Sequence, residues 1–342
     1  MRRDGSQVFH VSDSEAGQSL LASLRRWRPE AAGSEAAQLL RNRQVQIDGN
    51  LCDDPQRRLK IGEVVKLLPH AIAAPPTEAD IGIQFVDEQL VVVEKPSGMT
   101  TMRHEEEAHW SARRRRREST LEDLLPNVLA KTLSSSRRGQ TSRVRPPRVI
   151  PVHRLDRDTS GLMVFARTVA AERSLVEQFR EHSIDRAYSA IVQGEIAEQT
   201  IESFLARDRG DGKRGSVSDS EQGQHAITHV RPIELVSGHT LVECRLETGR
   251  THQIRIHLSE AGHPVCGDKD YRGPLGSKPI LDRSGAPRLA LHAAELGFDH
   301  PLTGEPLHFE TRLPRDLADF LKRLRSDVPA AKSKIENRKS KM

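Results

Sequence analysis

The sequence has few of the features that mark a secreted, disulfide-stabilised or membrane-spanning protein. It contains three cysteines, Cys52, Cys244 and Cys266, with no CxxC spacing, which argues against a disulfide framework and a structural zinc site and fits a reducing cytoplasm. The first fifteen residues hold no apolar signal-peptide core, and no run of eighteen apolar residues occurs anywhere. We therefore expect a cytoplasmic protein without a membrane segment.

Aromatic residues and nucleotide-binding motifs are also scarce. Aromatics make up 4% of the chain, which argues against a nucleic-acid surface built from rows of stacked rings. No GxGxxG follows a predicted strand, and no GxxxxGK[ST] occurs, so no nucleotide cofactor is expected. His104 and His109 are five residues apart and would project about 140° from each other on a helix, which excludes a metalloprotease-type metal site. The sequence thus predicts neither a cofactor nor a metal.

Positive charge is present in clusters. The formal charge is +5, and arginines gather at 113–117, at 137–148 and near the C-terminus. Such clusters indicate a polyanionic partner, and the alternative is a solvated run of charge.

The 342 residues are enough for one large domain and one small domain. We expect the following division: a flexible N-terminus at 1–16, a small α/β domain at 17–70, a linker at 71–80 around Pro75-Pro76, a larger domain at 81–325 with a basic and partly disordered insertion at 102–147, and a basic disordered tail at 326–342.

The small domain is predicted to hold two helices and a short sheet. An apolar-periodic segment ends at Pro29, a second helix begins near Ser34, and "QVQIDGN" and "IGEVVKLL" supply strands and a tight turn. This unit resembles an S4 RNA-binding domain, although Glu35 stands where that family usually has a basic residue. The resemblance implies RNA contact, with five cations able to supply it: Arg41, Arg43, Arg57, Arg58 and Lys60. A purely structural domain is the alternative.

The larger domain is predicted to be of the α+β class. It shows a hairpin over 83–98, a short helix beginning after Ser119 and a strand with Tyr188, Ala190 and Val192 on one face. Strands over 227–236 and 241–247 and a helix over 254–261 come next. Two short strands over 289–313 and a helix over 317–324 follow. Because strands and helices do not alternate regularly, the pattern favours a mixed, largely antiparallel sheet.

One segment of the larger domain has an unusual density of charge. "VHRLDRDTSG" at 152–161 places two carboxylates, two guanidiniums and an imidazole between apolar strands. Asp156 or Asp158 could act as a nucleophile or a base, provided that a guanidinium keeps the carboxylate ionised. Four arginines are candidates for that partner: Arg154, Arg157, Arg250 and Arg255. The alternative is an ion-paired turn without a catalytic role.

Five ordered segments resemble the RluA family of RNA pseudouridine synthases. They are "QFVDEQLVVVEKPSGM", "HRLDRDTSGLMVFART", "RAYSAIVQGEI", "ETGRTHQIRIHLSEAGHPVCGDKDY" and "RLALHAAELGFDHPLTGEPLHFE", and together they cover most of 83–310. The resemblance implies the pseudouridine synthase fold. It also implies isomerisation of specific uridines in structured RNA, ribosomal RNA being favoured over transfer RNA, without a cofactor.

The same resemblance implies roles for individual residues. Asp156 would be the catalytic carboxylate, as a nucleophile or as a base, with Arg255 as its salt-bridge partner. Tyr188 would lie against the target base and assist the final proton removal, and Arg154 would lie near the vacated position of the base. Arg250 and His252 are the further expected base- and RNA-binding residues. We expect a monomer, and the alternative function is a non-catalytic RNA-binding or ribosome-assembly protein.

Overall fold

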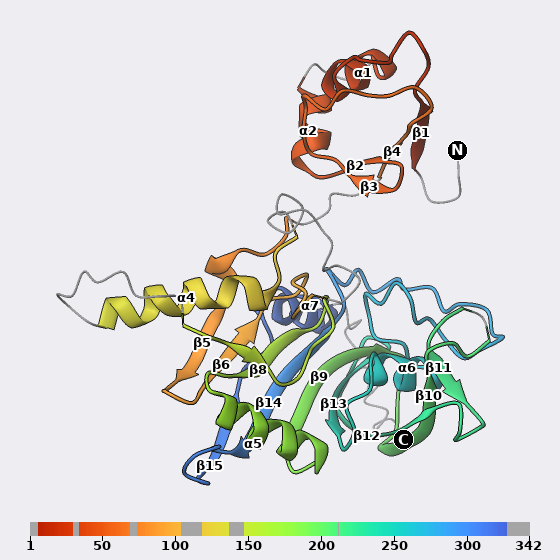
Figure 1. Ribbon diagram of the computed structural model, residues 1–342. Helices are drawn as coiled ribbons and strands as arrows, with labels where there is room; N and C mark the ends of the chain where they lie inside the picture. The colour runs from red at the N-terminus through yellow and green to blue at the C-terminus, as the bar shows by residue number, and fades with distance from the viewer. Residues whose placement is uncertain are drawn as a thin grey trace, which may run out of the picture. The chain divides into compact units, whose positions relative to one another are not determined.

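The chain forms two compact units in the computed structural model, Met1–Pro75 and Pro76–Met342 (Figure 1). The structure describes residues 6–29, 34–68, 74–103, 118–136, 147–210 and 212–326. The arginine clusters at 113–117 and over most of 137–148 lie outside these ranges, as does the tail from 327. The division after Pro75 falls inside the expected linker. Within the described ranges no helix is long and apolar enough to cross a membrane.

The first unit packs two helices against a small antiparallel sheet. The sheet has the strand order β1-β4-β2-β3. The elements are β1 (Gln7–His10), α1 (Leu20–Trp27), α2 (Glu35–Arg41), β2 (Val45–Ile47), β3 (Asn50–Leu51) and β4 (Val64–Leu67). Leu20 and Leu24 of α1 and Leu40 of α2 are buried against Val45 and Val65 of the sheet. Burial of these apolar side chains stabilises the unit.

The expected flexible N-terminus at 1–16 is wrong for part of its length. Residues 7–10 form β1, which pairs with β4 in the register Phe9↔Val65. Phe9 stacks on Trp27 of α1 with ring centroids 4.8 Å apart, and Val11 is buried. Because β4 would otherwise present unpaired N–H and C=O groups, a short segment that the polar composition marked as loose becomes an edge strand.

The second unit is built on a single sheet of eleven strands. Its main path runs β11-β10-β12-β13-β9-β14-β8-β6-β5, with β15 paired to β14 and β7 to β8. The strands are β5 (Gly82–Val86), β6 (Leu90–Lys95), β7 (Ile150–Pro151), β8 (Ser160–Ala166), β9 (Asp185–Gln193), β10 (Gln199–Ala206), β11 (Gly215–Val217), β12 (Gln224–Val236), β13 (His239–Leu246), β14 (Leu291–Asp299) and β15 (Pro306–Glu310). Among the described strands only β14 and β8 pair in parallel. The predicted α+β class with a largely antiparallel sheet is confirmed.

Helices cover both faces of this sheet. They are the single-turn η1 (Glu78–Asp80), α4 (Leu121–Ser136), α5 (Val169–Arg180), α6 (Gln253–Glu260) and α7 (Arg315–Ser326). Alternation along β6 and β8 sends Val91 and Met163 to the core shared with α4, α6 and α7. Leu90 and Leu162 point to the opposite core, which α5 closes. Both faces of the central strands are therefore dry, which explains their continuous apolar runs.

The expected insertion at 102–147 contains more regular structure than its composition indicated. Helix α4 runs for sixteen residues, beyond the short helix predicted there, and includes Ser134–Ser136, which fall inside the insertion that we expected to be partly disordered. Leu121, Leu125 and Leu129 lie at i, i+4 and i+8 and are completely buried. This apolar stripe against the sheet keeps the helix intact although Pro126 removes one backbone hydrogen bond.

Candidate active site

A cavity of about 410 Å³ opens where three segments distant in sequence meet. The loop between β7 and β8, the start of β9, and the turn that leads into α6 all contribute to its wall. All six residues named from the sequence line this one cavity: Asp156, Tyr188, Arg255, Arg154, Arg250 and His252. The tertiary structure thus brings together side chains that lie up to about a hundred residues apart.

Asp156 is held in place because the backbone on both sides of it is anchored. Thr101 Oγ1 accepts from the Leu155 N–H at 3.2 Å and donates to the Leu155 carbonyl at 3.0 Å. On the other side the Arg157 carbonyl accepts from the Gly98 N–H at 2.8 Å. Both anchors come from the segment after β6. A carboxylate with a fixed backbone needs little reorganisation before it reacts.

Lys95 lies beneath this loop and is completely buried. Its Nζ donates to the carbonyls of Pro96 (3.0 Å), Met99 (2.8 Å) and Arg157 (3.0 Å). Burial lowers the pKa of Lys95 from 10.5 to about 7, and the charges of Asp156 and Asp158 act in the opposite direction. This lysine therefore ties the loop to the end of β6 and adds positive charge behind the carboxylate when it is protonated.

Gly161 fixes where the loop ends. Its φ is +121°, and a Cβ there would lie 2.2 Å from the Ala293 carbonyl oxygen of β14. Only glycine allows this approach. The contact lies next to the parallel pairing of β8 with β14, so it fixes the end of the loop that carries Asp156.

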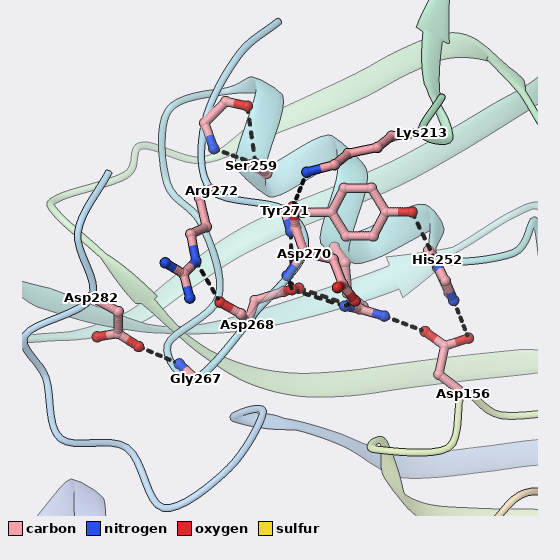
Figure 2. A network of polar contacts seen from close by, with 12 residues as sticks. Asp156, Lys213, His252, Ser259, Gly267, Asp268, Asp270, Tyr271, Arg272 and Asp282 are labelled. Carbon is pink, nitrogen blue, oxygen red and sulfur yellow. Dashed lines mark hydrogen bonds and ion pairs between the residues drawn. The ribbon is translucent and has the colours of Figure 1, made fainter. Parts of the chain in front are cut away.

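Arg255 joins Asp156 to two further carboxylates, those of Asp268 and Asp270. Figure 2 labels these three aspartates. Its Nη1 lies 3.7 Å from Asp156 Oδ2. The shorter contacts go to Asp268, where Nε and Nη2 donate at 2.7 and 2.8 Å, and to Asp270, where Nη2 donates at 2.9 Å. Hydrogen bonds to buried Asp268, together with the nearby carboxylate charges, raise the pKa of Arg255 above its usual range despite desolvation. The guanidinium is thus permanently charged and oriented mainly by Asp268.

His252 forms a second contact with the carboxylate. Its Nε2 lies 3.8 Å from Asp156 Oδ1, and its Nδ1 is 2.8 Å from the Tyr271 hydroxyl (Figure 2). Desolvation lowers the pKa of His252, with Arg255 and Arg214 adding to the effect and Asp156 opposing it. The residue has φ of 62°, the left-handed region, at the N-cap of α6. Such backbone strain is typical of functional positions and stores about 1–3 kcal/mol.

Tyr188 is buried on β9, and desolvation raises its pKa above the ordinary value of 10, so it is a neutral phenol near pH 7. Arg250 donates from Nε to the His225 carbonyl at 3.0 Å, while Arg154 is exposed at the rim. Of the other charged groups of the opening loop, His153 Nε2 accepts from the Val164 N–H at 3.0 Å and its ring stacks on Phe179. Burial lowers the pKa of His153 to about 3, so it holds the loop as a neutral ring.

Several residues of the site were given no role from the sequence. Asp268, Asp270 and Tyr271 lie in the "GDKDY" run, and Lys95 in "EKPSG", but neither spacing showed what these side chains contact. Asp268 is identifiable only in three dimensions, because its partner is thirteen residues earlier on a helix. Lysine is almost never fully buried, and nothing in the sequence around Lys95 indicated that it would be.

The chain matches known proteins over most of its length. Residues 89–260 match the family model described as RNA pseudouridylate synthase. Ribosomal large subunit pseudouridine synthase D of Zymomonas mobilis is 36% identical over 281 residues, covering 81% of this chain and 84% of the relative. The protein of the same name from Xanthomonas campestris is 34% identical over 335 residues, covering 94% and 93%.

A solved structure agrees with the sequence comparisons. The human RNA pseudouridylate synthase domain containing 4 superposes with a TM-score of 0.54 at 27% identity, over 71% of this chain and 93% of that chain. The matched family residues include the Asp156 loop, Tyr188 and Arg255. The chain is therefore an isomerase of uridine in RNA and belongs to the RNA pseudouridylate synthase family, as the resemblance to RluA-type enzymes predicted.

Proposed function

We propose that this enzyme converts specific uridines of large-subunit ribosomal RNA to pseudouridine, with Asp156 as the essential carboxylate. The observation that carries the proposal is the position of Asp156, which faces the cavity between Arg255 and His252 on a loop anchored on both sides. Relatives that cover more than nine-tenths of both chains are named as ribosomal large subunit synthases, which supports ribosomal RNA over transfer RNA.

The reaction requires a group that helps the uracil ring to leave C1′ and return through C5. Asp156 can attack C1′ or remove a proton from the sugar, and both routes need its ionised form. Arg255 and His252 approach the two oxygens separately, which orients the carboxylate toward the cavity. Tyr188, as a buried phenol, packs against the uracil and can hydrogen-bond during the final removal of the C5 proton.

The target base must leave its stack to enter the cavity, which costs a few kcal/mol. Arg154, exposed at the rim, is placed to occupy the space that the base vacates. Arg250 would contact the RNA backbone beside it. Both arginines line the cavity, which supports these two roles.

The first unit is proposed to act as an S4-like RNA-binding domain. Arg43 and Arg57 face acidic neighbours, Asp53 at 3.6 Å and Glu63 at 2.5 Å. Arg41, Arg58 and Lys60 are exposed, and they carry the proposed RNA contact. Replacing Lys60 by Gln should then weaken RNA binding and lower the salt dependence of the affinity, as measured by titration at several salt concentrations. An unchanged salt dependence would instead favour a structural domain.

We also propose a cytoplasmic location, which fits an action on ribosomal RNA, and a monomeric state. Sedimentation of the purified protein with and without ribosomal RNA measures its mass directly.

The catalytic proposal is tested by mapping pseudouridine chemically in large-subunit ribosomal RNA and in transfer RNA after incubation with the enzyme. Asp156→Asn should form no product while it unfolds like the wild type. Asp158→Asn is the matched control, because that carboxylate is in the same loop but exposed. Product from Asp156→Asn at the wild-type rate would refute the role of Asp156. Binding without product by the wild type on every RNA would favour the non-catalytic ribosome-assembly alternative.

A further inference from the structure

The cavity has an excess of positive charge. Five arginines line it, Arg154, Arg180, Arg186, Arg250 and Arg255, against the single carboxylate of Asp156. Most of this charge is exposed or balanced: Arg255 has Asp268 and Asp270, and Arg180 pairs with Glu177 on α5. Arg186 differs from both, because within the described chain no carboxylate lies within ion-pairing distance of it.

Arg186 is buried and poorly satisfied. Its residue is 9% exposed, and its Nη2 donates to the Glu247 carbonyl at 3.0 Å. Its Nε is buried and has no hydrogen-bond acceptor among the described residues. The guanidinium carbon lies 5.6 Å from the ring centre of Phe179. A guanidinium offers five N–H donors, so a single carbonyl leaves donors of Arg186 available to a group that enters the cavity.

The chain makes room for this cation. A Cβ on Gly249 would lie 2.7 Å from Arg186 Nη1, so the absence of a side chain at 249 lets the guanidinium reach the cavity wall. Arg186 is two residues before Tyr188 on β9, and the charges of both Arg186 and Asp156 act on the Tyr188 hydroxyl. The cation and the carboxylate thus face the same enclosed space from different walls.

The proposed reaction creates negative charge in that space. When the C1′–N1 bond breaks, the electron pair stays with N1, and the uracil becomes an anion with charge on N1, O2 and O4. This holds whether Asp156 attacks C1′ or takes a proton from the sugar. The anion is consumed when its electron pair forms the bond from C5 to C1′. The C5 proton is then removed, and N1 takes up a proton. A fixed, uncompensated cation at low dielectric stabilises such a charge strongly.

We propose that Arg186 forms the anion-stabilising subsite of the cavity, where its guanidinium stabilises the departing uracil ring. The inference rests on the proposed uridine isomerisation. Arg255 is a weaker candidate for this task, because Asp268 and Asp270 already neutralise it. Arg186 is the buried lining cation whose field no such carboxylate cancels.

The test compares RNA that carries uridine with RNA that carries 5-fluorouridine at the target position. Fluorine withdraws electrons and stabilises the uracil anion without help from the protein. In single-turnover reactions, Arg186→Gln should slow cleavage of the uridine glycosidic bond by about 100- to 1000-fold. The loss should be clearly smaller on 5-fluorouridine RNA, while Arg186→Lys, which keeps the charge, should recover part of the rate on uridine.

Two further variants separate this role from folding and from general RNA attraction. Gly249→Ala keeps the charge of Arg186 but displaces its Nη1, and it serves as the test if Arg186→Gln does not fold. Its loss of rate should likewise be larger on uridine RNA than on 5-fluorouridine RNA. Arg180→Gln removes an exposed rim cation, and its effect should be equal on both RNAs. Equal losses on both RNAs for Arg186→Gln or Gly249→Ala, or a wild-type rate in either, would overturn the subsite. A wild-type enzyme that makes no pseudouridine on any RNA would overturn the proposed function instead.

Discussion

Asp268 is the residue on which the orientation of Arg255 should depend most. It accepts from two guanidinium nitrogens at 2.7 and 2.8 Å, and its side chain is 1% exposed. Its Oδ1 also accepts from the Asp270 and Tyr271 N–H groups, which shapes the turn after α6. Asp268→Asn keeps the shape and one acceptor oxygen but removes the charge and turns an N–H₂ group toward the arginine.

The expected effect on stability is large because both partners are buried. Removing one partner of a buried ion pair typically lowers the free energy of unfolding by about 3–5 kcal/mol. For a domain of this size that loss corresponds to a fall in Tm on the order of 10 °C. The rate should fall as well, since a misplacement of about 1 Å at a reacting group can lower kcat by about 100-fold.

Asp270 provides the matched control on the same guanidinium. It accepts a single bond at 2.9 Å, and its side chain is 65% exposed. Because the Asp270 carboxylate is exposed to solvent, this contact should contribute only about 0–1 kcal/mol. Scanning calorimetry of the transition of the larger unit, with single-turnover pseudouridine formation, measures both variants. Equal destabilisation by Asp268→Asn and Asp270→Asn, or an Asp268→Asn enzyme as stable and as fast as the wild type, would refute the reasoning.

Three further predictions concern groups around the site. The pKa of Lys95 is lowered in the folded state to about 7, so above that pH the unfolded chain binds more protons than the folded chain. The free energy of unfolding should therefore rise from pH 7 toward 10.5, and Lys95→Met should lack this rise. Burial lowers the pKa of His257 to about 4, so the unfolded chain binds more protons than the folded chain between pH 4 and 6.5. The free energy of unfolding should therefore fall as the pH falls through this range, and in denaturant titrations it should fall less for His257→Gln. Gly161→Ala should destabilise the larger unit by more than about 3 kcal/mol in denaturant titrations, because a Cβ at 161 would collide with the backbone of β14. Gly238→Ala is the control: a Cβ there meets open space, so only the smaller strain of its positive φ should lower the stability.

The sequence predicted much of the fold because, in most elements, the order of apolar and polar residues within the segment itself sets which face is buried. The alternating faces of β6 and β8 and the helical spacing in α6 follow from neighbouring residues, and they define an α+β domain. Prediction from the sequence failed where a contact with a distant segment decides whether a helix or strand forms. Strand β1 pairs with the edge of β4, which lies more than fifty residues later in the chain. Helix α4 is held by leucines that pack on the core of the larger unit.

For the site, the sequence by itself predicted which side chains meet in one cavity, and their chemical roles stay predictions. The charge density at 152–161 pointed to a carboxylate and a nearby guanidinium, and the family resemblance separated Asp156 from Asp158. Tertiary structure alone decided how these groups are held. Arg255 is oriented chiefly by Asp268, Lys95 fastens the loop from below, and Arg186 is left without a carboxylate. The physical reason is that electrostatic partners depend on distance and burial, which the fold creates between residues far apart in the chain.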